Sequence, residues 1–202
     1  MKTRTLVAGF VISALLSACA SQPSYVDTDN DRGPITMSLD YRDFNKAADA
    51  AIEELLASPN LVNPAGGRYI LAIGRISNRT MQHIDTDSVV KKIRVALLNS
   101  GRVVTTTAIA HGGPEDDMVM QVRSLRTSTE FDQSSVAEQG TLRAPDLSLT
   151  GKFIQRTVRA GKNHQQVEYR FQISVTDLRS GVAIFEHEKE IVKRGTNKTV
   201  VW

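Results

Sequence analysis

The sequence predicts an α+β fold in which helices pack on a mixed or antiparallel sheet. Two segments carry apolar residues at helical spacing, two short runs are rich in aliphatic or β-branched residues, and the last third alternates between apolar and polar residues. Spacings of three and four mark one face of a helix, whereas strict alternation marks a strand with one buried face. The order is helix, strand, helix, strand, helix and then a three-stranded meander, which predicts helices layered on a sheet.

Two helices can be predicted together with their ends. The first spans residues 41–57, with Asp40 as its cap and residues 58–60 as its stop. The second spans residues 86–99, and either Asp85 or Thr86 can cap it. Each has a recurring set of apolar residues that predicts one buried face. These are Phe44, Ala47, Ala48, Ala51, Ile52, Leu55 and Leu56 in the first helix, and Val89, Val90, Ile93, Ala96 and Leu97 in the second.

Two apolar runs predict strands beside these helices. Residues 69–76 form a short apolar run, which is typical of a strand flanked by packed elements. Residues 103–108 are rich in valine and threonine and predict an adjacent strand.

A third helix is expected to open at residues 112–114. Pro114 suits a first helical turn, and the acidic residues 115–117 would complement the helix dipole there. Three apolar residues would then face the core: Met118, Val122 and Leu125. The acidic triplet is also a candidate metal site, although its position favours the helix start. Residues 127–146 are polar and irregular, which predicts a surface loop or a frayed helix end.

The clearest strand pattern comes last. Residues 147–153 and 167–175 alternate between apolar and polar side chains, with a turn at residues 159–163 between them. A second turn at residues 177–181 returns the chain as residues 182–192. This is the three-stranded meander of the predicted fold.

The amino-terminal segment ends in the only cysteine of the chain. A short basic start is followed by an apolar run from Leu6 to Leu16 and then by Leu16-Ser17-Ala18-Cys19. The run is too short for a membrane span, and an aliphatic residue, two small residues and a cysteine resemble a bacterial lipobox. We therefore expect residues 1–18 to be a removed signal peptide and Cys19 to carry a covalent lipid.

This interpretation sets the domain organisation. Residues 19–37 would be the lipidated amino terminus and a flexible polar linker, and residues 38–202 one globular domain. Ala20 follows the cysteine, where an aspartate would disfavour sorting to the outer membrane. By resemblance to lipoproteins of Gram-negative bacteria, the expected location is therefore the periplasmic face of the outer membrane.

Composition and motifs exclude several classes of function. The formal net charge is +3, of which Lys2 and Arg4 supply two, so the mature chain is near neutral and gives no nucleic-acid signal. We find no glycine-rich phosphate loop, no nucleophile elbow and no zinc spacing among the four histidines. The sequence thus predicts no enzyme, no metal site and no cofactor beyond the lipid on Cys19.

The polar face of the predicted meander is the candidate partner-binding site. It would present a flat basic and amide-rich surface made of Lys152, Arg156, Arg170, Gln172 and Arg179, together with Gln166. Such a surface suits the acidic patch of another protein. It is equally consistent with an ordinary solvent-facing sheet or with one covered by a helix. Glu186, Glu188 and Glu190 share one strand face, which is interpreted as solvated.

Three segments carry a family resemblance. Residues 145–154, 169–181 and 191–195, and more loosely 69–108 and 41–57, resemble the LpoB family of outer-membrane lipoproteins. The resemblance implies a fold similar to the N-terminal domain of TolB. It also implies a role in activating a class A penicillin-binding protein: the domain would dock on a non-catalytic domain of this bifunctional synthase and raise glycan polymerisation and cross-linking. The linker at residues 20–37 is shorter than is usual in that family.

Two other functions stay open at this point. One is an envelope secretion or assembly lipoprotein of TolB or curli type, because related folds occur there. The other is a small hydrolase of cell-wall material, for which no catalytic set is visible in the sequence.

Overall fold

The computed structural model describes residues 23–199. The chain divides into two units between Pro34 and Ile35. The expected signal peptide and Cys19 lie outside the described residues. In the described part of the first unit, the Asn30 amide donates to the Asp27 carbonyl at 3.3 Å and forms a turn. The second unit begins earlier than residue 38, since Met37 is already buried in its core.

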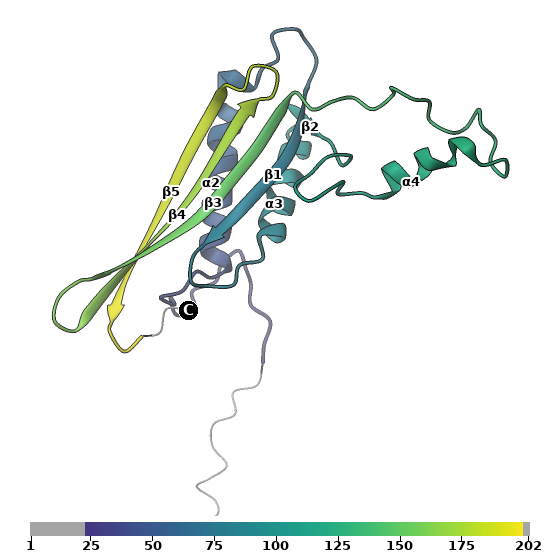
Figure 1. Ribbon diagram of the computed structural model, residues 1–202. Helices are drawn as coiled ribbons and strands as arrows, with labels where there is room; N and C mark the ends of the chain where they lie inside the picture. Colours follow the sequence, from purple (N-terminus) through teal and green to yellow (C-terminus); the bar gives the residue numbers. More distant parts are fainter. Residues whose placement is uncertain (1–22, 200–202) are drawn as a thin grey trace, which may run out of the picture. The chain divides into compact units, whose positions relative to one another are not determined.

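The second unit is built on a mixed sheet. Its strands run in the order β2-β1-β3-β4-β5 (Figure 1). Their bounds are β1 Tyr69–Arg79, β2 Val103–Thr105, β3 Leu147–Arg159, β4 His164–Asp177 and β5 Ala183–Thr196. Strand β1 pairs in parallel with β2 and β3, while β3, β4 and β5 pair antiparallel. The α+β class, the mixed sheet and the meander are therefore confirmed.

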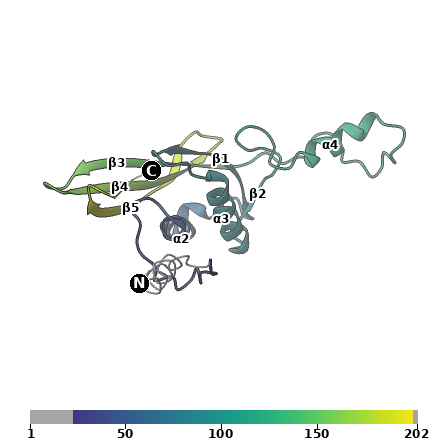
Figure 2. The same ribbon diagram turned by 90° about the horizontal axis from the view of Figure 1, so that it is seen from below.

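Both capped helices lie where the sequence predicts them. Helix α2 spans Tyr41–Ala57 and helix α3 spans Thr86–Asn99. The Asp40 carboxylate accepts the amides of residues 42 and 43 in a capping box, and Asp85 rather than Thr86 caps α3. Seen from below, both helices lie on the same face of the sheet (Figure 2). Among the residues that the structure describes, no helix lies over the opposite face.

The core fills the space between these two helices and the covered face of the sheet. Phe153 stacks on Phe171 with ring centroids 4.5 Å apart, and Phe44 of α2 meets Phe153 edge-on at 5.4 Å. The Tyr169 hydroxyl donates to the Met37 carbonyl at 3.1 Å. Because this hydroxyl bond joins β4 to the segment before α2, it fixes where the second unit begins.

The third helix differs from its prediction. Helix α4 spans only Met118–Ser124, after Pro114 and the acidic triplet, and a 3₁₀ turn at Leu125–Thr127 follows it. Met118 is 55% exposed, and no residue of α4 is buried. The prediction that its apolar residues face the core is wrong. The chain leaves the sheet after β2, which ends at Thr105 rather than at residue 108. Helix α4 lies in the long connection between β2 and β3 (Figure 1).

A second 3₁₀ turn, Pro59–Leu61, follows α2 and ends it as expected. Strand β1 runs three residues past its predicted end because β3 continues to pair with it as far as Arg79. This extension of β1 comes from a pairing partner that lies far away in the sequence.

Candidate functional site

The uncovered face of the sheet carries four of the five predicted partner-binding residues. Lys152 and Arg156 lie on β3, and Arg170 and Gln172 lie on β4. Lys152 is directly opposite Gln172 in the antiparallel register, so all four side chains share one face. We call this surface the open face. Arg179 lies in the turn after β4, outside the strands that form the open face.

A row of glutamates borders this face on β5. Glu186, Glu188 and Glu190 lie opposite Ser174, Gln172 and Arg170, respectively. Each glutamate carboxylate accepts from the residue opposite it. Arg170 binds Glu190 at 3.0 Å, and this hydrogen bond together with the nearby negative charges raises the pKa of Arg170. Arg170 and Gln172 are therefore engaged with the acidic row.

The two basic residues of β3 are in a different situation. Lys152 and Arg156 are exposed, and within residues 23–199 neither makes a charge pair shorter than 4.0 Å. The open face is consequently basic along β3 and acidic at Glu186, Glu188 and Glu190 of β5. Glu168 lies opposite Arg156 on β4, and Arg194 follows the acidic row on β5 and donates to Gln166. The alternation of residues predicts the basic side chains of this face, but the interpretation of the glutamates as merely solvated leaves out their bonds to β4. The hairpin turn at residues 177–181, followed residue by residue, would have placed the acidic row beside Arg170.

The arrangement suits binding rather than chemistry. Over the open face lies a shallow hollow of about 510 Å³, lined by residues such as Lys152, Gln172 and Glu188. In residues 23–199, no cluster of three histidine, cysteine, aspartate or glutamate side chains is placed to hold a metal ion. No helix in that same range is long and apolar enough to cross a membrane.

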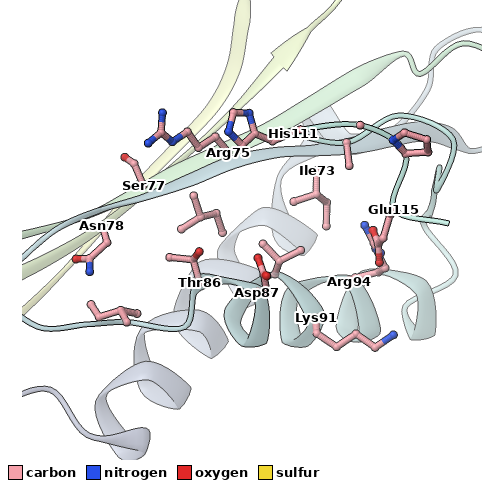
Figure 3. Close-up of a pocket in the computed structure, with 18 of the residues that line it drawn as sticks. Ile73, Arg75, Ser77, Asn78, Thr86, Asp87, Lys91, Arg94, His111 and Glu115 are labelled. Carbon is pink, nitrogen blue, oxygen red and sulfur yellow. The ribbon is translucent and has the colours of Figure 1, made fainter. Parts of the chain in front are cut away.

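A second concavity, which the sequence analysis did not predict, lies between β1 and α3 (Figure 3). Its volume is about 790 Å³. Arg94 of α3 lines it, is only 5% exposed and forms an ion pair with Glu115. Burial lowers the pKa of Arg94. Arg94 lies four residues after Val90 in α3. Residues at this spacing share one face of a helix, so the sequence already places the Arg94 side chain on the same face as Val90.

The comparison with protein families is decisive for this chain. The model of the peptidoglycan-synthase activator LpoB matches residues 43–191. The chain belongs to the LpoB family. This match covers both packed helices, the sheet almost to the end of β5, and the open face. The family named by the sequence resemblance is thus confirmed.

Solved structures of LpoB proteins are similar to this chain. The LpoB C-terminal domain from Salmonella enterica is 13% identical, with a TM-score of 0.42, and the match covers 74% of this chain and 98% of that one. The LpoB C-terminal domain from Escherichia coli is 14% identical, with a TM-score of 0.43, and the match covers 74% of this chain and 98% of that one. The solution structure of E. coli LpoB is 14% identical, with a TM-score of 0.38 and coverage of 89% and 82%. No curated protein sequence matches the chain.

Proposed function

We propose that this protein is a lipid-anchored envelope protein that binds a class A penicillin-binding protein and stimulates its glycan polymerisation and cross-linking. The observation that carries the proposal is the family match over residues 43–191, whose description names the activation of a peptidoglycan synthase. Family membership supports this function over a secretion or assembly role and over hydrolysis of wall material. The protein would act as a regulator and not as an enzyme.

The anchor in this proposal is a lipid on Cys19, in the outer membrane. It rests on the order of basic start, apolar run, small pair and cysteine in the first nineteen residues. The stretch between Cys19 and Ile35 could span at most about 55 Å when fully extended, at ~3.3–3.6 Å per residue. The docking domain of the synthase therefore has to come within that distance of the membrane, plus the size of the folded unit.

The open face is the proposed docking surface. Its basic and acidic rows form a charge pattern that can orient a partner with the opposite pattern, and such patterns raise the rate and specificity of association. Lys152 and Arg156 carry the part of that pattern that makes no ion pair in residues 23–199, although Glu168 of β4 lies opposite Arg156 in the register. Activation then needs only that the active state of the synthase binds this face more tightly than the inactive state does.

Reconstitution tests this function directly. The full-length protein is mixed with a detergent-solubilised class A synthase, and lipid II consumption and peptide cross-linking are followed over time. We expect faster polymerisation and a direct complex in a pull-down. The absence of both would overturn the proposal, and product formation without any synthase would show a hydrolase instead.

Charge reversal tests the docking surface. Lys152→Glu should weaken the complex about tenfold, because a cation at the interface becomes a like charge for the partner's acidic patch. Arg170→Glu should weaken it too, although this change also places a third carboxylate beside Glu188 and Glu190. Arg143→Glu is the matched control, since Arg143 is exposed and lies outside the sheet. Equal effects of Lys152→Glu and Arg143→Glu would rule out the open face.

A further inference from the structure

The concavity between β1 and α3 runs along a sheet edge that has no strand partner. Strand β2 pairs with β1 only at Tyr69–Leu71, and one further bond joins the Thr106 amide to the Leu71 carbonyl at 3.0 Å. Beyond this point the chain turns away. Among the residues that the structure describes, no backbone hydrogen bond joins residues 73–78 to the loop at 107–115. The backbone groups on this side of β1 are free to pair with another strand.

The apolar lining of this groove belongs partly to the core, since Ile73 and Ile76 are 2% and 6% exposed. Its apolar lining includes Ile73 and Ile76 from β1 and Val90 from α3. The loop at residues 112–114 closes one end, and the amide of Glu115 ties it back to the Thr107 carbonyl at 2.8 Å. In Figure 3, β1 and α3 run along opposite sides of the lining side chains. The groove is therefore bordered by β1 on one side and by α3 on the other, which suits a peptide that adds beside β1.

Arg94 supplies a specific polar feature inside the groove. Its ion pair with Glu115 involves the Nη1 atom, while its Nε atom is buried and has no hydrogen-bond partner. Buried donors without a partner are rare in folded proteins. A guanidinium binds carboxylates through paired donors, so the free Nε position is suited to a second carboxylate. Glu115 shows that a carboxylate can reach this guanidinium.

The charges around the groove favour the same ligand. Arg75 and Lys91 line it and are exposed, and Asp87 is the acidic lining residue besides Glu115. Because Glu115 already neutralises Arg94, the remaining fixed charges leave an excess of one positive charge.

We infer that this groove binds an extended, acidic segment of a partner protein, which adds as a strand to the free edge of β1 and places one carboxylate on the Nε side of Arg94. Backbone pairing with β1 supplies affinity, and the buried guanidinium selects an acidic side chain at one position. This site is separate from the open face and goes beyond the proposed function.

Defined peptides test the inference. The probes are fluorescein-labelled hexapeptides of the pattern Thr-X-Glu-X-Thr-X, with X as valine or isoleucine, measured by fluorescence anisotropy against the full-length protein. Replacing the glutamate of the peptide by glutamine should weaken binding about tenfold or more, because a charge-assisted hydrogen bond is lost. N-methylation of alternate amides should abolish binding when the methylated edge faces β1 and leave it unchanged on the other edge.

One variant of the protein should bind the peptide more tightly, whereas a general loss of stability would weaken binding. Glu115→Gln should tighten binding several-fold, since Arg94 then keeps its full charge for the peptide. Asp117→Asn is the matched control, because Asp117 is an exposed acid nearby that makes no side-chain capping bond to α4. Arg94→Lys should weaken binding about tenfold through loss of the planar fork. If this variant is unfolded, the sign of the Glu115→Gln effect alone decides.

Several results would overturn the inference. These are no binding of any peptide up to about 1 mM, equal affinity of glutamate and glutamine peptides, equal effects of methylation on the two edges, or weaker binding by the Glu115→Gln variant. Full displacement of the peptide by acetate at millimolar concentration would show a site for small anions only. Lys152→Glu should leave peptide binding unchanged while weakening the synthase complex, so that failure here is distinct from failure of the proposed function.

Discussion

The two faces of β4 are made by the same fourteen residues and behave in opposite ways. On the covered face, Tyr169, Phe171 and Ile173 are at most 2% exposed and pack beneath the helices. On the open face, Arg170 and Gln172 are only partly buried and bind glutamates of β5. The covered face therefore contributes the buried core, and we propose that the open face carries recognition. Four predictions test this division, in order of expected effect.

Truncation in the aromatic stack should have the largest effect. Phe171→Ala removes the ring that stacks on Phe153 and leaves a cavity in the core. We expect the free energy of unfolding to fall by about 3–5 kcal/mol, measured by urea denaturation of the full chain. The neighbouring Gln172→Ala is the matched control and should change it by about 0.5 kcal/mol or less. Similar losses for both variants would contradict the division between the faces.

The buried cation of β5 should come next. Lys193 is 8% exposed, donates to the Ser38 carbonyl at 2.6 Å and forms an ion pair with Asp43 of α2. Lys193→Met leaves the partly buried carboxylate of Asp43 without its cation, so we expect a loss of about 1–3 kcal/mol in the same denaturation assay. Adding Asp43→Asn should recover part of that loss. If the loss of unfolding free energy in the double variant equals the sum of the losses in the two single variants, Lys193 and Asp43 are not energetically coupled.

Alkaline pH should weaken the covered face through Tyr169. Burial, with a contribution from the charge of Asp43, raises the pKa of Tyr169 from 10.0 to about 12. Between these values the unfolded chain loses the proton while the folded chain retains it. Stability is therefore complete below pH 10 and falls as the pH rises towards 12, by up to about 2–3 kcal/mol. In urea titrations from pH 9 to 12, Tyr169→Phe should lose this part of the slope, and an unchanged slope would contradict the assignment.

The ion pair on the open face should have the smallest effect on stability. Arg170 and Glu190 have side chains that are 41% and 47% exposed. Exposed pairs contribute about 0–1 kcal/mol, and salt screens them. Arg170→Met should therefore change the free energy of unfolding by less than about 0.5 kcal/mol, while weakening the synthase complex in the pull-down. A larger loss of stability would show that the open face helps to hold the fold together.

Local patterns predict a large part of this fold. The bounds of α2 and α3 follow from acidic caps at Asp40 and Asp85 and from apolar residues every three or four positions. The meander follows from strict alternation, because a strand with one buried face can place its apolar residues only on that side. Both signals lie within a few residues of the structure that they specify.

The region after β2 shows the limit of such patterns. The spacing of Met118 and Val122 is helical, and a short helix does form, but none of its residues is buried by the described part of the chain. Periodicity reports that a face exists and not what covers it. Likewise, valine and threonine at residues 103–108 favour extended backbone, but β2 ends where its pairing with β1 ends.

The sequence alone determined the two capped helices, the meander and the family, because each depends on residues close together in the chain or on a motif that can be matched directly. Only the tertiary structure decided which charges meet. It placed Glu188 and Glu190 beside Arg170, and it enclosed Arg94 with Glu115 next to an unpaired edge of β1. The physical reason is that register and packing join residues that are distant in the chain, and the energy of a charge depends on its neighbours in space.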